Sequence, residues 1–473
     1  MVCQYIMTTL EELGLLKMDF LGLRNLTVLD DAVKMVQTRQ PDFTLDDIPE
    51  GDPETYKMLS DGKTNGVFQM ESSGMTGVCV GLKPQSIEDI TAIIALYRPG
   101  PMDSIPTYLR NRHEPDKISY KTPQLAHILD VTNGCIVYQE QVMQIFRELA
   151  GFSFGQADNV RRAMSKKKHA VMEAEREHFV YGCTDPGNEC PGCVANGISE
   201  KVANEIYDEM SSFASYAFNK SHAACYAYVA FQTAYLKCHY PSEFMAALLT
   251  SVLDNTDKVI EYSGECARLG IKVLPPDVNV SNGGFTADGS GQIRFGLNAV
   301  KNVGRNLIEN VVKGRQNKPY TSLYDFCKRM HGNELNRRAV ECLIKAGAFD
   351  HLGNNRHSHV EAVEGILKSI ETDSRRNLDG QLDLFSVMSG EAQSGASEDN
   401  YEIRQLPEYS HKELLQQEKE VSGLYLSGHP LDAYREKSAR IGSHTIKDLT
   451  GEDAHVTDGE RVRVCLLYTS DAA

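Results

Sequence analysis

Apolar residues recur at helical spacing through most of the chain, so the hydrophobic pattern predicts a mainly α-helical protein with small β elements. One predicted helix follows Gly22, and another ends before Gly151. The apolar positions of the two helices are Leu26, Leu29, Ala32, Val33 and Val36, and then Val142, Met143, Ile145, Phe146, Leu149 and Ala150. Residues from about 45 to 250 are expected to be mostly helical. Two irregular stretches should interrupt them: residues 97–102, where two prolines and a glycine favour a rigid non-helical loop, and residues 182–196.

Residues 255–360 have the pattern of a smaller, separate domain. Residues 270–280 are expected to be extended and to contain a short strand. Residues 295–304 then predict a short helix and a tight turn at Val303 and Gly304, followed by a second helix. This is a helix-hairpin-helix pattern, in which the glycine lets backbone amides approach a DNA phosphate. An ordinary helical hairpin fits the same pattern, and residues 335–349 offer a related helix.

Beyond this domain the polar residues 366–408 predict a flexible linker. It contains one apolar island, whose residues are Gln381, Leu382, Asp383, Leu384 and Phe385. Large apolar side chains in a polar linker are candidates for burial in a partner's groove, although docking onto the same chain is an equal alternative. Residues 424–432 predict a turn into a short helical segment, and the start of a β domain should follow.

Composition narrows the class of protein. A chain of 473 residues has room for about three domains, and 41% hydrophobic with 24% charged residues is ordinary for a soluble globular protein. Without a membrane-length apolar run or a signal segment, a cytoplasmic protein is expected, and the scattered cysteines fit reduced thiols. The net charge of −16 makes a uniformly nucleic-acid-coated surface improbable, so anion binding would need local basic patches.

The clearest such patch is a run of five cations in eight residues. Its members are Arg161, Arg162, Lys166, Lys167 and Lys168. Repulsion of this strength is tolerated where an anionic ligand such as a triphosphate or a nucleic-acid backbone binds, but a solvated lysine turn fits the run equally well. A second candidate is the segment 218–225. There Ser221 is expected to cap a helix running to about Tyr240, with Lys220 and His222 beside its positive N-terminal end. An ordinary capped core helix is the alternative.

The irregular stretch 182–196 carries three thiols, Cys183, Cys190 and Cys193. Their spacing supplies a ligand-like pair and a third sulfur, but no fourth Cys or His follows nearby. Because structural zinc sites have four ligands, a plain loop is favoured over a zinc site, although His178 or a distant residue could complete one.

Six blocks of residues, in order along the chain, resemble the alpha-subunit family of bacterial DNA polymerase III, the C-family replicative polymerases. The blocks are residues 17–24, 66–72, 97–102, 161–168, 218–223 and 424–431. The resemblance covers residues 10 to about 464. The cysteine-bearing stretch departs from the family's commonest pattern, so the resemblance assigns it no role.

The resemblance implies a domain order and a chemistry. It divides the chain into the end of a palm (1–42), fingers (43–254), a helix-hairpin-helix clamp-binding domain (255–365), a linker with a clamp motif (366–408) and the start of an OB-fold (409–473). Asp19 matches one of three palm aspartates that hold two Mg²⁺ ions. The other two match no stretch of this chain, so the chain alone is expected to be inactive. Both ends are expected to be truncated, and residues 466–473 resemble vector-derived sequence.

The resemblance also assigns partners. Primed template DNA and deoxynucleoside triphosphates are expected at the fingers, a sliding clamp at residues 381–385, and other polymerase III holoenzyme subunits elsewhere. No membrane association is expected. The cations that it assigns to the nucleotide or template are Arg98, Arg161, Arg162, Lys166, Lys167, Lys168 and Lys220. Two alternatives are a non-catalytic module binding DNA and the clamp, and an enzyme acting on small phosphorylated metabolites.

Overall fold

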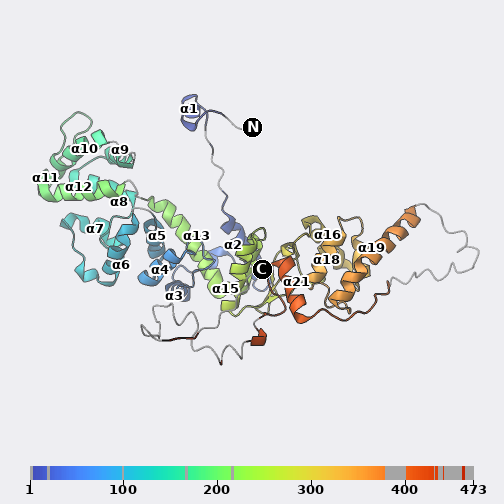
Figure 1. The fold of residues 1–473 in the computed structure, drawn as a ribbon. Coiled ribbons are helices and arrows are strands. Elements are labelled where there is room, and N and C mark those ends of the chain that lie inside the picture. The colour runs from blue at the N-terminus through green and yellow to red at the C-terminus, as the bar shows by residue number, and fades with distance from the viewer. Residues whose placement is uncertain are drawn as a thin grey trace, which may run out of the picture. The chain divides into compact units, whose positions relative to one another are not determined.

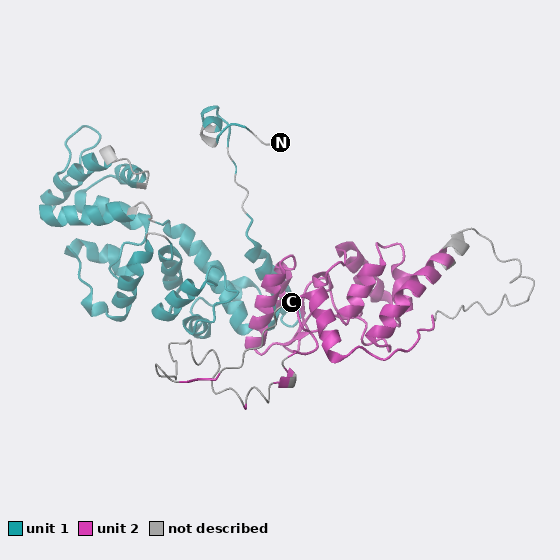
Figure 2. Cartoon of the chain, in the orientation of Figure 1, with its two compact units in different colours: residues 1–245 teal, residues 246–473 magenta. Residues whose placement is uncertain are grey.

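The computed structural model describes residues 4–16, 18, 22–98, 101–165, 169–214, 218–378, 401–430, 432–434, 440 and 461–463. The chain divides into two compact units, Met1–Met245 and Ala246–Ala473 (Figure 2). Both are mainly helical, as the hydrophobic pattern predicts (Figure 1). Within the described residues, no helix combines the length and apolar character needed to cross a membrane.

The first unit contains only helices among its described elements. The α-helices are α1 (Met7–Glu12), α2 (Arg24–Gln37), α3 (Pro53–Ser60), α4 (Ser73–Leu82), α5 (Ile87–Leu96), α6 (Ile105–His113), α7 (Ala126–Leu129), α8 (Gln139–Ala150), α9 (Phe154–Ser165), α10 (His169–Tyr181), α11 (Gly192–Ala195), α12 (Glu200–Ala214) and α13 (Lys220–His239). The 3-10 helices are η1 (Leu45–Asp47), η2 (Pro101–Ser104), η3 (Pro115–Lys117), η4 (Pro123–Leu125) and η5 (Asp130–Thr132). Helix α14 (Pro241–Ser251) crosses into the second unit.

One core of this unit forms where α5 packs against α13. Every residue of α5 except Glu88 is buried, and the side chain of Ser86 caps the helix by accepting from the Asp89 amide at 3.2 Å. The facing side of α13 presents small residues, so the two backbones can approach closely. These are Ala223, Ala227, Ala230 and Ala234, all buried. Helices α3 and α4 complete this core.

A second core in the same unit is organised by Phe146 of α8. Its ring centroid lies 5.3 Å from that of Phe152, 5.0 Å from Phe179 and 6.0 Å from Tyr207. The apolar positions predicted for this helix are buried, except that Met143 is only partly so. Gly151 ends the helix with a φ of 74°, a left-handed conformation that glycine adopts without strain.

A short helix overlaps each of the two stretches predicted to be irregular, 97–102 and 182–196. Pro101 begins η2, because a proline at the first helical position has its φ already set. Residues 192–195 form α11.

The second unit contains a small sheet and a set of helices. Its strands are β1 (Val273–Leu274), β2 (Thr286–Ala287) and β3 (Ile293–Arg294), in the order β1-β3-β2, with β1 parallel and β2 antiparallel to β3. Strand β1 confirms the strand predicted within 270–280. The helices are α15 (Thr256–Arg268), η6 (Leu297–Ala299), α16 (Arg305–Asn317), α17 (Leu323–Met330), α18 (Arg337–Lys345), α19 (Arg356–Leu378), α21 (His411–Ser422) and η7 (Asp432–Tyr434).

The predicted flexible linker 366–408 is wrong at both of its ends. Residues 366–378 continue helix α19, because Ile366 and Ile370 extend its buried stripe and are 0% and 5% exposed. Residues 401–408 pack back onto the start of the same helix. The side-chain amide of Asn355, directly before α19, donates to the Leu406 carbonyl at 2.6 Å, and the Glu408 carboxylate accepts from the backbone amide of Arg356 at 3.0 Å. The clamp motif 381–385 lies outside the described residues.

The domain limits stay a prediction. The predicted boundary between fingers and the next domain falls at 254/255, and the two units divide at 245/246, within α14. Most of the range expected to begin an OB-fold lies outside the described residues, and its described part includes α21.

Candidate functional site

Two helices of the first unit begin side by side. Tyr138, directly before α8, and Phe218, two residues before α13, form a parallel bridge in which the Gln139 amide donates to the Phe218 carbonyl at 3.0 Å. Glu140 then reaches across, and its carboxylate accepts from the side-chain amide of Asn219 at 3.0 Å and the backbone amide of Lys220 at 3.1 Å. We call these residues, 138–140 and 218–220, the helix-start junction.

The cap of α13 lies two residues before the one predicted. Asn219, not Ser221, is the N-cap, and its Oδ1 accepts from the His222 amide at 2.8 Å. Both residue types cap helices well, and the extended backbone at Asn219 decides between them. Because Glu140 occupies the Lys220 amide, an incoming anion meets the cationic side chains around this helix start more readily than its backbone amides.

Three predicted cations lie at the helix-start junction: Lys220 belongs to it, and Arg98 and Arg161 contact it. The guanidinium carbon of Arg98 lies 3.6 Å from the centroid of the Phe218 ring, and the Lys220 ammonium lies 5.5 Å from that of Tyr138. Arg161 donates through Nη1 to the side-chain oxygen of Gln139 at 3.0 Å. Partial burial lowers the pKa of Arg98, yet an arginine so placed stays charged near neutral pH. The cation–π contacts hold the charged groups of Arg98 and Lys220 against the Phe218 and Tyr138 rings.

Arg161 and Arg162 share one carboxylate. Asp158 accepts from Arg161 at 2.7 and 3.0 Å and from Arg162 at 2.7 Å, and the hydrogen bond from Arg161 lowers the pKa of Asp158. The Arg162 side chain is 66% exposed and that of Arg161 only 20%. Arg162 is therefore the member of the pair that is open to an outside anion, while Arg161 fastens α9 to the start of α8.

His222 joins the same group through ring contacts. Its centroid lies 5.3 Å from that of Phe218, in an edge-on arrangement, and 4.3 Å from that of Tyr226. The structure thus brings Arg98 and Arg161, which lie far away along the chain, together with Lys220 and His222 at the start of α13. Lys166, Lys167, Lys168 and Asp19 lie outside the described residues, so their placement is not part of this geometry.

Sequence reasoning missed Tyr138, Gln139 and Glu140, which hold the junction together. The buried Gln141 fixes them: its Oε1 accepts from the amides of Val137 and Tyr138 at 2.9 and 3.0 Å. A polar run in the first turn of an otherwise apolar helix was the available signal, but it is also the ordinary appearance of a helix start.

The hairpin predicted at Val303 and Gly304 lies in the second unit. It joins η6 to α16, and Gly304 is the N-cap of α16. A Cβ atom built on Gly304 would meet nothing nearer than the Glu334 carboxylate, at 3.7 Å. The open space in front of this backbone is compatible with close approach of a phosphate, whereas the charge of Glu334 would oppose it.

The cysteine stretch behaves as a loop. Cys183 and Cys190 exchange two backbone hydrogen bonds of 2.9 Å, and the Cys190 thiol faces the His178 carbonyl at 3.6 Å. Cys193 is fully buried, which raises the pKa of its thiol to about 12. Within the described residues, no metal-sized group of three ligand atoms forms here.

Comparison with known proteins supplies the family. Residues 25–187 match the model of the bacterial DNA polymerase III alpha subunit finger domain, and residues 270–359 match a helix-hairpin-helix motif. The chain is 42% identical to DNA polymerase III subunit alpha of Bacillus subtilis over 450 residues, which are 94% of this chain and 38% of that protein. It is 44% identical to the Thermus aquaticus subunit over 456 residues, 95% of this chain and 36% of that one.

A third relative, the Xylella fastidiosa subunit, is 42% identical over 468 residues, 98% of this chain and 37% of that protein. The chain therefore spans a little over a third of the length of these relatives. Over that span, the chain belongs to the alpha-subunit family of bacterial DNA polymerase III.

Proposed function

We propose that this chain is part of a replicative DNA polymerase catalytic subunit, and that its first unit binds the incoming deoxynucleoside triphosphate and the template. The observation that carries the proposal is the convergence of Arg98, Arg161 and Lys220 on the helix-start junction. They come from three separate parts of the chain, which itself carries a net charge of −16. Fixed cations at one place are what a triphosphate or a phosphate backbone requires.

The proposed reaction is template-directed nucleotidyl transfer. Two Mg²⁺ ions, when bound, would activate the primer hydroxyl and stabilise the leaving pyrophosphate, and Asp19 is proposed as one of their carboxylate ligands. Asp19 lies outside the described residues. The part assigned to the described residues is orientation: Arg98, Lys220 and the exposed Arg162 would hold phosphate oxygens as negative charge moves during transfer.

Binding to labelled primed DNA, measured by fluorescence anisotropy at several salt concentrations, tests this assignment. Removing one phosphate contact reduces the slope of log affinity against log salt by about 0.9 on duplex and about 0.7 on a single strand. We expect that change for Lys220→Ala and for Arg162→Ala. Lys201→Ala on α12, where the side chain is 87% exposed, is the matched control and should leave the slope unchanged. Equal slopes in all four proteins would remove the assignment.

Primer extension tests the catalytic half separately. Because two of the three expected palm aspartates match nothing in this chain, the purified chain with Mg²⁺ and all four triphosphates should extend no primer. Incorporation above background would show that the chain carries a complete metal site.

A second candidate is a non-catalytic module that binds DNA and a sliding clamp. The helix-hairpin-helix match over 270–359 and the open space at Gly304 favour it. The clamp would bind the motif 381–385, with Leu384 and Phe385 in an apolar pocket. Replacing both by Ala should abolish binding to a bacterial clamp, and Gln381→Ala should weaken it. Unchanged affinity would end the clamp proposal.

The third hypothesis, an enzyme for small phosphorylated metabolites, is not favoured by the lining of one cavity in the first unit. A cavity of about 440 Å³ in the first unit has two acids and no cation among its described lining residues. The acids are Asp103 and Glu209, which would repel a phosphate. Other polymerase III holoenzyme subunits as partners, and a cytoplasmic location, are proposals that follow from the family alone.

A further inference from the structure

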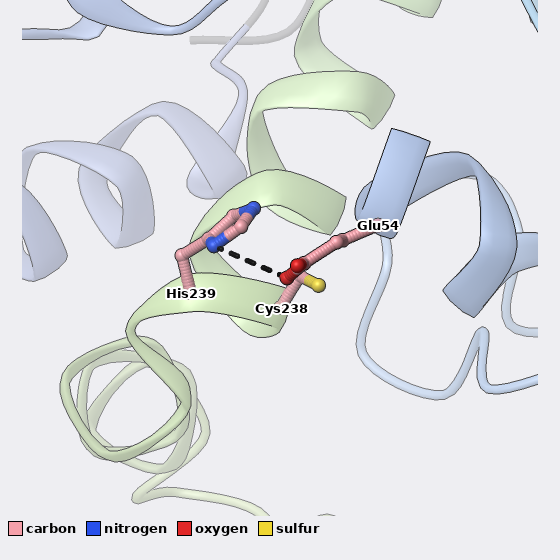
Figure 3. A group of neighbouring side chains, drawn as sticks. All are labelled: Glu54, Cys238 and His239. Atoms are coloured by element: carbon pink, nitrogen blue, oxygen red, sulfur yellow. Dashed lines mark ion pairs between the residues drawn. The ribbon is translucent and has the colours of Figure 1, made fainter. Parts of the chain in front are cut away.

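Apart from the helix-start junction, three side chains with metal-binding atoms meet where α13 ends and α3 begins (Figure 3). Cys238 and His239 are the last two residues of α13, and Glu54 is the second residue of α3. A sulfur, an imidazole nitrogen and a carboxylate oxygen lie within 4.8 Å of one another. Throughout the described residues, this is the one group of three such side chains that meets so closely.

The imidazole of His239 is held in the orientation that a metal ligand needs. Its Nε2 lies 2.8 Å from the Asp52 carboxylate, and its Nδ1 lies 4.0 Å from the Glu54 carboxylate. Asp52 is itself fixed as the N-cap of α3 by the Thr55 amide, at 2.8 Å, and the Tyr235 ring packs 4.4 Å from the imidazole. With Nε2–H donated to Asp52, the Nδ1 lone pair faces Glu54. Carboxylates orient metal-binding histidines in this way.

We propose that Glu54, Cys238 and His239 form a Zn²⁺ site of three protein ligands, with water in the fourth position. Zinc accepts sulfur, imidazole and carboxylate ligands together at tetrahedral geometry. Its bonds of about 2.0–2.3 Å would place the ligand atoms roughly 3.3–3.8 Å apart. The 4.0 Å separation of Nδ1 from the Glu54 oxygen therefore has to close only slightly, and the Glu54 side chain, 74% exposed, is free to move that far.

The two helix ends at this site have opposite effects on the binding of a cation. The C-terminal end of α13 carries partial negative charge and favours a cation, whereas the N-terminal end of α3 disfavours one. Burial raises the pKa of the Cys238 thiol, so the metal would have to displace its proton. The competing explanation is that His239 only bridges the Asp52 and Glu54 carboxylates. That arrangement does not involve the Cys238 thiol, so a test of Cys238 distinguishes it from a metal site.

Titration of the purified full chain with Co²⁺ under reducing conditions tests the site, because a thiolate bound to Co²⁺ gives an intense charge-transfer absorption. We expect one equivalent to produce that absorption, and Zn²⁺ to displace it. Cys238→Ser should abolish the absorption. Glu54→Gln, at an exposed position where the fold is not at risk, should weaken Co²⁺ binding at least tenfold. Asp52→Asn, which loosens the orienting carboxylate, should weaken it about 10- to 100-fold.

Two matched controls locate the sulfur. Cys225→Ser removes an exposed thiol from the same helix, and Cys190→Ser removes one from the cysteine loop; both should keep the absorption. The proposal is overturned if the parent chain gives no thiolate absorption, if Cys238→Ser leaves it intact, or if Cys190→Ser removes it.

Discussion

Replacing Gly74 by alanine tests how the packing of α4 positions Arg98. A Cβ atom on Gly74 would lie 2.5 Å from the ring carbon Cζ of Tyr97 and closer still to its hydroxyl. Tyr97 is the C-cap of α5 and directly precedes Arg98. The added methyl group must therefore push the Tyr97 ring away, and we expect the neighbouring Arg98 to shift with it.

Two opposing effects determine how Gly74→Ala changes the free energy of unfolding. Alanine in place of a helical glycine stabilises a helix by up to about 1 kcal/mol. Inserting a methyl group into an occupied place costs typically about 1–3 kcal/mol. Gly77 of the same helix has no atom within 4 Å of a built Cβ, so Gly77→Ala shows the first effect alone. The two variants should therefore differ in unfolding free energy by about 1–3 kcal/mol, with Gly77→Ala the more stable.

Urea unfolding followed by circular dichroism measures that difference, and anisotropy with primed DNA measures its consequence. Gly74→Ala should bind DNA more weakly than the parent chain although no charge has been removed, while Gly77→Ala should bind as the parent does. If the two variants are equally stable and bind equally well, Tyr97 does not restrain Arg98 as the structure implies.

Three other perturbations have defined outcomes. Gln141→Leu leaves the amides of Val137 and Tyr138 without their acceptor and should cost about 1–3 kcal/mol for each, measured by urea unfolding. Arg356→Met breaks a buried pair with Glu418, 2.9 Å apart, and also the pair with Asp350, 2.7 Å apart, and should lower the stability of the second unit by about 3–5 kcal/mol. The double variant Arg356→Met/Glu418→Gln should recover the part of that loss that comes from leaving Glu418 buried and unpaired. Burial lowers the pKa of His359, so the unfolded chain binds the extra proton first; stability should be complete above pH about 6.5 and fall as the pH drops towards the folded pKa. His359→Leu should remove that fall in a thermal-melt series, and an unchanged pH profile would contradict it.

The sequence predicts local structure better than it predicts the junction. The apolar stripe of α8 fixes that helix, since burying one face requires the observed spacing. The sequence could not show that Asn219 and not Ser221 is the cap, because both residue types favour caps. The extended backbone conformation at Asn219 makes the difference. The pairing of Tyr138 with Phe218 depends on which helix starts meet in space, and no local pattern carries that information.

The same limit explains the linker and the metal site. Polar composition in 366–378 outweighed Ile366 and Ile370 in the sequence-based prediction, although in the fold these two side chains are buried and α19 continues to Leu378. Glu54 and His239 are separated by most of the first unit along the chain, so their meeting at the end of α13 has no sequence signature.

The length of α19 sets a limit on where the apolar island can go. The helix extends to Leu378, and Gln381 is three residues further along the chain. Three residues span at most about 11 Å, so the leading glutamine stays within that radius of the helix tip. A protein bound to residues 381–385 would therefore be tethered within a short distance of the C-terminal end of α19.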